Sequence, residues 1–293
     1  MNHTQKGLLL PIPQHSRYLS FQLVTGGDPM GALQRLSSLC DGESLVLGLS
    51  QSCVQALQCV VPGLRSFVPL SGPGFDVPST QEALWCWLRG HERGELVLRA
   101  MEIEELLLPD FELGQVVDGF KHGNGLDLTG YEDGTENPKG QEAVDAALVQ
   151  GQGEGLDFSS FVAVQQWEHD FTAFSGMSKQ EQDHVIGRER VSKEELEDAP
   201  ESAHVKRTAQ ESFAPEAFVL RRSCPLADER GAGFYFVAFG RSFDAFEAQM
   251  RRMVGLDDGI VDGLFSISKP LTGSYYWCPP MLNGTLYLRA IKR

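Results

Sequence analysis

Short apolar runs, separated by glycine, proline and helix-capping residues, divide the first half of the chain into six elements. Runs that alternate apolar and polar residues predict strands, and apolar residues at three- and four-residue spacing predict helices. Asp28-Pro29 and Ser79-Thr80-Gln81-Glu82 resemble helix starts, and Gly90 resembles a helix end. The expected order is strand 18–24, helix 28–40, strand 44–49, strand 64–70, helix 79–90 and strand 95–101.

The second half repeats this order of strands and helices. Strands are expected at 161–167, 217–222, 233–239 and 264–268, and helices at 178–187, from 192 onward and at 242–253. A glycine-rich linker, 151–155, separates the halves, and its spacing does not match a dinucleotide-binding fingerprint. The pattern predicts an α+β protein of two ferredoxin-like β-α-β-β-α-β units with antiparallel sheets, residues 1–150 and residues 151–293.

The composition is that of an ordinary globular protein, with 42% hydrophobic residues and a formal net charge of −15. Such a charge repels phosphate groups, so nucleic acid and anionic membranes are poor partners. No apolar run approaches the roughly 18 residues of a membrane span, and the proline-broken run at 8–13 does not resemble a secretory signal. The six cysteines form no Cys-x-x-Cys pair, which favours buried thiols. We therefore expect a cytoplasmic protein.

Residues 130–138, Gly-Tyr-Glu-Asp-Gly-Thr-Glu-Asn-Pro, place the carboxylate of Asp133 at the apex of a tight turn. Glycines let the backbone bend sharply and approach a flat ligand closely. A carboxylate held rigidly there can carry a proton. Asp-Gly and Asn-Pro are also ordinary surface-turn sequences. The turn alone therefore leaves both interpretations open.

Five motifs follow one another in a defined order: Gly-x-x-Asp-Gly at 130–134, Ala-His-Val at 203–205, Arg-x-Ser-x-Pro at 221–225, Asp-Gly-Ile-x-Asp-x-Leu-Phe at 258–265 and Tyr-Tyr-Trp-Cys-Pro-Pro at 275–280. In their order and spacing, the chain resembles the dye-decolorising peroxidases, and most of all their compact bacterial cytoplasmic branch. The resemblance extends from residue 22 to residue 288. It implies one haem b per chain, bound mainly by the second unit.

The resemblance also implies a role for several residues. His204 matches the axial iron ligand, and Asp133 and Arg221 match the catalytic pair on the opposite, distal face. Gly134 lets the backbone approach the porphyrin, Ser223 is a distal hydrogen-bonding group, and Glu216 is a candidate partner for the second ring nitrogen of His204. The alternatives are His169 as ligand, Arg222 as the pocket arginine, and an exposed glutamate at 216 without a role.

A peroxidase of this kind would reduce hydrogen peroxide and oxidise small organic donors, such as dyes and phenols, by one-electron steps. An aspartate in place of a distal histidine suggests an acidic activity optimum. Two other functions stay open: a haem- or porphyrin-handling protein with incidental peroxidase activity, and a haem-free interaction module. Tyr131, Trp167, Tyr235 and Trp277 are either electron relays or core residues. We also expect a homo-oligomer, and no carboxy-terminal targeting tail.

Overall fold

A computed structural model of the chain describes residues 3–229 and 231–292. The first part contains β1 (His15–Leu23), α1 (Pro29–Ser37), β2 (Leu45–Leu49), α2 (Gln51–Ala56), β3 (Leu70–Gly72), β4 (Phe75–Val77), β5 (Leu84–Gly90), α3 (Arg93–Leu107), β6 (Phe111–Phe120) and α4 (Gly140–Ala147). The second part contains β7 (Ser160–His169), α5 (Phe171–Gly176), α6 (Lys179–Ile186), α7 (His204–Arg207), β8 (Leu220–Arg221), β9 (Cys224–Asp228), β10 (Gly231–Gly240), α8 (Asp244–Met253), β11 (Ser268–Pro270), β12 (Ser274–Cys278), β13 (Met281–Leu282) and β14 (Thr285–Leu286). Short 3₁₀ helices occur at η1 (Lys6–Leu8), η2 (Gln210–Ser212), η3 (Gly263–Ser266) and η4 (Arg289–Ile291).

Ten strands form one antiparallel sheet in the order β11-β7-β12-β2-β5-β1-β6-β9-β10-β8. A further pairing of β7 with β10 closes the sheet into a barrel-like ring. Large aromatic side chains fill the cluster enclosed by the ring. Tyr18 stacks on Tyr235 with ring centroids 3.8 Å apart, and the Nε1 of Trp85 donates a hydrogen bond to the Tyr235 hydroxyl at 3.1 Å. The α+β class is confirmed.

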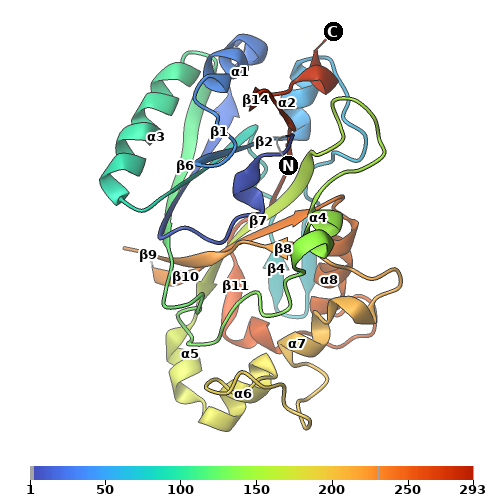
Figure 1. The fold of residues 1–293 in the computed structure, drawn as a ribbon. Helices are drawn as coiled ribbons and strands as arrows, with labels where there is room; N and C mark the ends of the chain where they lie inside the picture. Colours follow the sequence, from blue (N-terminus) through green and yellow to red (C-terminus); the bar gives the residue numbers. More distant parts are fainter. Residues whose placement is uncertain (1–2, 230, 293) are drawn as a thin grey trace.

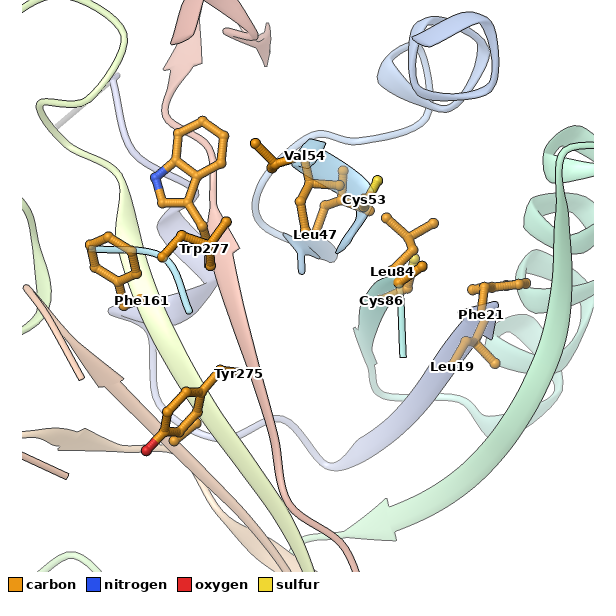
Figure 2. Packing of buried hydrophobic residues seen from close by; sticks show 14 of the residues in the cluster. Leu19, Phe21, Leu47, Cys53, Val54, Leu84, Cys86, Phe161, Tyr275 and Trp277 are labelled. Carbon is orange, nitrogen blue, oxygen red and sulfur yellow. The ribbon is translucent and has the colours of Figure 1, made fainter. Parts of the chain in front are cut away.

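The outer face of the ring carries the second hydrophobic cluster. Helices α1 and α3 lie side by side over strands of the first part (Figure 1). Figure 2 shows this cluster running from Leu19 and Phe21, past Leu84 and Cys86, to Trp277 and Phe161 on β12 and β7. The outer face of β7 and β10 continues the cluster toward α8. A cavity opens where that packing ends.

Several predicted elements are confirmed. Strands 18–24, 44–49, 161–167 and 233–239 appear as β1, β2, β7 and β10, and helices 28–40, 178–187 and 242–253 appear as α1, α6 and α8. In α6 the Ser178 hydroxyl accepts a hydrogen bond from the Glu181 backbone, and the Glu181 carboxylate accepts one from the Ser178 backbone. The cysteines are unpaired thiols, and five of the six are buried. Within the described residues, no helix is long and apolar enough to cross a membrane.

The predictions for residues 79–101 were wrong. Residues 84–90 form strand β5, because this run is buried on both faces and its apolar residues therefore do not alternate with polar ones. The expected helix start at 79–82 does not cap a helix. The Gln81 carboxamide instead forms hydrogen bonds with the backbone N–H and C=O of Tyr275. Residues 93–107 form helix α3, and two of its apolar residues, Leu98 and Met101, are exposed, which obscured the helical pattern.

Other errors concern short elements. Residues 64–69 form a loop, no helix begins at 192, and 264–268 is mostly the 3₁₀ helix η3. The predicted strand 217–222 shrinks to β8, and β6, β9 and β12 were not predicted. These strands depend on partners that lie far away in the sequence, so local patterns do not indicate them.

The barrel interior provides a test of the fold. Trp85 is fully buried and stacks against both Tyr18 and Tyr276. We expect Trp85→Ala to lower the free energy of unfolding by about 3–5 kcal/mol, because it leaves a cavity that the ring cannot fill. Leu98→Ala on the exposed face of α3 should change it by less than about 0.5 kcal/mol. Equal urea midpoints for the two variants would contradict this packing.

Candidate active site

An open cavity of about 870 Å³ lies against the outer face of β7 and β10. Most of its wall is apolar, contributed by Trp167, Phe234, Phe236, Phe246, Met250, Met253 and Leu264. A second cavity of about 900 Å³ adjoins it and is more polar. The two share a wall that contains Tyr131, Asp133, Ile186, His204, Thr208 and Arg221. The structure therefore brings the three main predicted site residues to one place.

His204 is the first residue of α7, and its side chain is 22% exposed. Its Nδ1 lies 2.8 Å from an oxygen of Asp262, whose side chain is fully buried. The other carboxylate oxygen of Asp262 accepts a hydrogen bond from the Leu264 backbone N–H at 2.8 Å. A carboxylate partner at Nδ1 places the proton there and leaves the Nε2 lone pair free. Within the described part of the chain, no hydrogen-bond partner contacts Nε2.

The prediction that Glu216 supports His204 is wrong. Glu216 lies beside a different cavity, together with residues of α4 and of the segment 213–218. Asp262 takes the position beside the histidine instead. Its signal was present in the sequence, since Asp262 is the second aspartate of the motif at 258–265.

His169, the alternative ligand, also lines the first cavity, but both of its ring nitrogens are occupied. Nε2 lies 3.0 Å from Asp127, and Nδ1 lies 2.8 Å from the Ser268 hydroxyl. Burial raises the pKa of Asp127, but the hydrogen bonds from His169 and Thr129 outweigh it, so the pKa is lower than usual. His169 thus holds the base of the loop that carries Asp133 rather than presenting a free nitrogen.

Asp133 and Arg221 face each other across the shared wall, with Oδ1 and Nη1 3.6 Å apart. Their side chains are 22% and 14% exposed. Arg222 lines neither of the two cavities. Its guanidinium donates hydrogen bonds to the carbonyl oxygens of Leu9 and Arg221, and burial lowers its pKa to about 10. Of the two arginines, Arg221 therefore lines the cavities.

Gly134 and Ser223 contribute to neither cavity wall. Gly134 has a φ of +76°, and a Cβ there would lie 2.6 Å from the Asn137 side chain, so the glycine serves the turn. The Ser223 hydroxyl is buried and accepts a hydrogen bond from the Val237 backbone at 3.2 Å. The expectation that Ser223 shares the pocket face with Arg221 was wrong, because β8 ends at Arg221 and strand alternation ends with it.

Further polar residues of the cavity wall include Gln165, which the sequence did not indicate, and Tyr131. Gln165 is buried in its wall and accepts a hydrogen bond from the Trp167 indole at 3.2 Å. The Tyr131 hydroxyl donates to the buried Asp183 at 2.5 Å. Tyr235 and Trp277, by contrast, are core residues.

The fold and the cavity define an α+β protein with a largely apolar site, where a histidine and an Asp–Arg pair meet. Residues 124–283, more than half of the chain, match the family model Dyp-type peroxidase, C-terminal. The chain therefore belongs to the family of dye-decolorizing peroxidases.

Known relatives agree with this assignment. A dye-decolorizing peroxidase from Mycolicibacterium paratuberculosis is 29% identical over 222 residues, which cover 74% of this chain and 63% of that protein. One from Rhodococcus erythropolis is 28% identical over 291 residues, which cover 93% of this chain and 85% of that protein. DyPB from Rhodococcus jostii RHA1 has a TM-score of 0.84 and 27% identity, and covers 92% of this chain and 94% of its own. A variant of the R. jostii protein was solved in complex with heme.

The Asp127–His169 contact predicts a pH-dependent stability. Because the pKa of Asp127 is lower in the folded chain, its ionised form stabilises the fold above the unfolded value of about 3.9. This contribution is lost as the pH falls through the folded pKa. We expect Asp127→Asn to cost about 1–3 kcal/mol at pH 7, and the difference from wild type to shrink below about pH 4. Melting temperatures measured across pH test this, with Glu105→Gln on the exposed face of α3 as the control. A difference that is constant down to pH 2 would contradict it.

Proposed function

We propose that this protein is a haem b peroxidase that reduces hydrogen peroxide and oxidises small organic donors such as dyes and phenols by one-electron steps. The observation that carries the proposal is the meeting of His204, Asp133 and Arg221 at one largely apolar cavity. The residues present fit one haem b per chain. The cavity wall is mostly apolar, which suits a flat apolar ring, and His204 offers a free nitrogen.

When bound, the haem supplies an iron centre at which peroxide and electrons are exchanged. His204 would hold the iron through Nε2. Asp262 keeps the proton on Nδ1 and raises the basicity of the imidazole, because it is a buried carboxylate in hydrogen-bond contact. The aromatic and methionine side chains of β10 and α8 would exclude water from the rest of the ring.

Asp133 is suited to move one proton. As a carboxylate it can accept the proton from the inner peroxide oxygen and return it to the outer oxygen, which leaves as water. Arg221 keeps its positive charge and stabilises the negative charge that develops as the O–O bond breaks. At 3.6 Å the two groups are farther apart than a charge-assisted hydrogen bond. The Asp133 oxygen therefore remains available to a substrate.

The same pair favours catalysis over haem transport. Charged groups in a largely apolar cavity lose hydration, which costs free energy. A haem carrier needs the apolar wall and the histidine, whereas the Asp–Arg pair adds nothing to carriage. Its presence supports the peroxidase function.

We further propose that residues 1–150 and 151–293 are two ferredoxin-like units. The supporting observation is that β1, α1, β2, β5, α3 and β6 follow one another along the chain, with α2, β3 and β4 inserted between β2 and β5. The four main strands are adjacent in the sheet as β2-β5-β1-β6. In the second part β12, β7, β10 and β9 are neighbours in a corresponding order. The cytoplasmic location and the homo-oligomer stay predictions.

Asp133→Asn tests the catalytic role. With haem bound, we expect the rate of reaction with peroxide to fall by about 10²–10⁴-fold, because proton transfer is lost, and its acid-side pH dependence to disappear. Rapid-mixing spectroscopy across pH measures both. Asp76→Asn, in the exposed β3–β4 hairpin, is the matched control. An unchanged rate and pH profile in Asp133→Asn, or an unchanged haem spectrum in His204→Ala, would overturn the proposal.

Asp262→Asn tests how His204 is held. We expect haem to remain bound while its reduction potential rises, because asparagine lacks the negative charge that makes the imidazole of His204 more basic. Activity should fall by about 10–100-fold. Potentiometric titration gives the potential, and Asp257→Asn, on the nearby exposed loop, is the control. Equal potentials in the two variants would show that Asp262 does not tune the site.

A further inference from the structure

The strand that carries Arg221 lies at an edge of the sheet. β8 pairs with β10 on one side and is the last strand in the sheet order. Arg222 donates its backbone N–H to Val237 on β10 at 2.8 Å. Because neighbouring residues of a strand direct their backbone groups to opposite sides, the N–H and C=O of Arg221 point away from β10. They need partners from outside the sheet.

Asn137 supplies a partner for each of the two groups with its side chain, and the Arg221 carbonyl also accepts from the Arg222 guanidinium at 2.9 Å. Its Nδ2 donates to the Arg221 carbonyl at 3.0 Å, and its Oδ1 accepts from the Arg221 N–H at 2.8 Å. A carboxamide has the same donor and acceptor as a peptide group. Asn137 thus contacts Arg221 as a neighbouring strand would, at a point where the next residue, Pro138, has no N–H to offer.

A second side-chain carboxamide makes a similar pair of hydrogen bonds at neighbouring residues of the same two segments. Gln210, which is buried, donates to the Glu136 carbonyl at 2.8 Å and accepts from the Val219 N–H at 2.9 Å. Two side-chain amides therefore connect the loop at 136–137 to the segment at 219–221. The loop follows the length of this edge rather than touching it at one point.

The same loop carries Asp133. The backbone N–H of Asn137 donates to the Gly134 carbonyl at 3.1 Å, which closes the turn, and the N–H of Asp133 donates to Gly125 at 3.2 Å. The direct Asp133–Arg221 contact is only a 3.6 Å approach between partly exposed groups. Such pairs contribute little on their own, so the backbone connection through Asn137 is the stronger constraint on their geometry.

We propose that Asn137 is a positioning residue, which holds Arg221 in register with Asp133 by clamping the Arg221 backbone. The inference rests on the proposed function of that pair. It assigns Asn137 no contact with substrate. Losing the clamp should let β8 move relative to the turn, and a shift of about 1 Å at such a site can cost 10²-fold in rate.

Asn137→Ala is the first variant. In the haem-free protein, we expect faster hydrogen exchange of the Arg221 amide, measured by mass spectrometry on peptides that cover 219–222, with little change in melting temperature. In the haem-loaded protein, we expect unchanged haem content, about 10–100-fold slower reaction with peroxide, and weaker cyanide binding. Asn124→Ala, at an exposed asparagine earlier in the same segment, is the matched control.

Asn137→Asp makes the test sharper. An ionised aspartate still accepts from the Arg221 N–H but repels its carbonyl, whereas a protonated one restores the donor. We therefore expect the peroxide rate of this variant, divided by that of wild type at the same pH, to recover as the pH falls. A ratio that does not change with pH would contradict the two-point clamp.

The Arg221→Ala background separates the two proposals. If Asn137 acts through Arg221, adding Asn137→Ala to Arg221→Ala should cause no further loss, and additive losses would overturn the positioning role. If Asp133→Asn and Arg221→Ala are slow but Asn137→Ala matches wild type in rate and exchange, the clamp is wrong and the peroxidase function stands. If Asp133→Asn and Arg221→Ala match wild type, the function itself fails.

Discussion

The pairing of β7 with β10 is the constraint on which the rest of the structure depends. It closes the sheet, and it gives both strands two different buried faces. Tyr235 and Val237 face the aromatic interior, whereas Phe234 and Phe236 form the floor of the cavity. A cavity wall made of paired strands is stiff, because each residue is held by ladder hydrogen bonds and by packing on the opposite face. The apolar half of the site is therefore fixed by the fold itself.

The polar half of the site is assembled differently. Its groups come from a loop, a one-turn helix and a two-residue strand, none of which is rigid alone. Each is held by polar side-chain contacts from another segment: Asp262 for His204, His169 for the base of the Asp133 loop, and Asn137 for the strand of Arg221. Hydrogen bonds of this kind stabilise little in net free energy but are costly to break inside a protein. They determine geometry more than stability.

Some parts of the fold and of the site could be predicted from the sequence, and others could not. Strands and helices with a regular apolar pattern, such as β10 and α8, could be predicted. Strand β5 was predicted as a helix because it is buried on both faces, and helix α3 was predicted as a strand because its exposed Leu98 and Met101 obscure the helical pattern. His204, Asp133 and Arg221 could be predicted from the order of motifs along the chain. The residues that hold them in place could not be predicted in this way. The choice between Glu216 and Asp262, or the use of Asn137 as a substitute strand, depends on which segments the sheet brings together.

The two buried faces of β10 also bear on how such a protein can change over evolution. A one-residue insertion in this strand would exchange Tyr235 with Phe234 and Phe236, so the interior and the cavity floor would be lost together. Neither strand has a neutral face on which substitutions can accumulate. The segment between α6 and α7 lines the second cavity with Arg188, Lys193 and Glu195. Unlike β7 and β10, it does not have two buried faces to maintain. Adaptation to new electron donors is therefore expected in that segment, while the strands beneath the cavity stay unchanged.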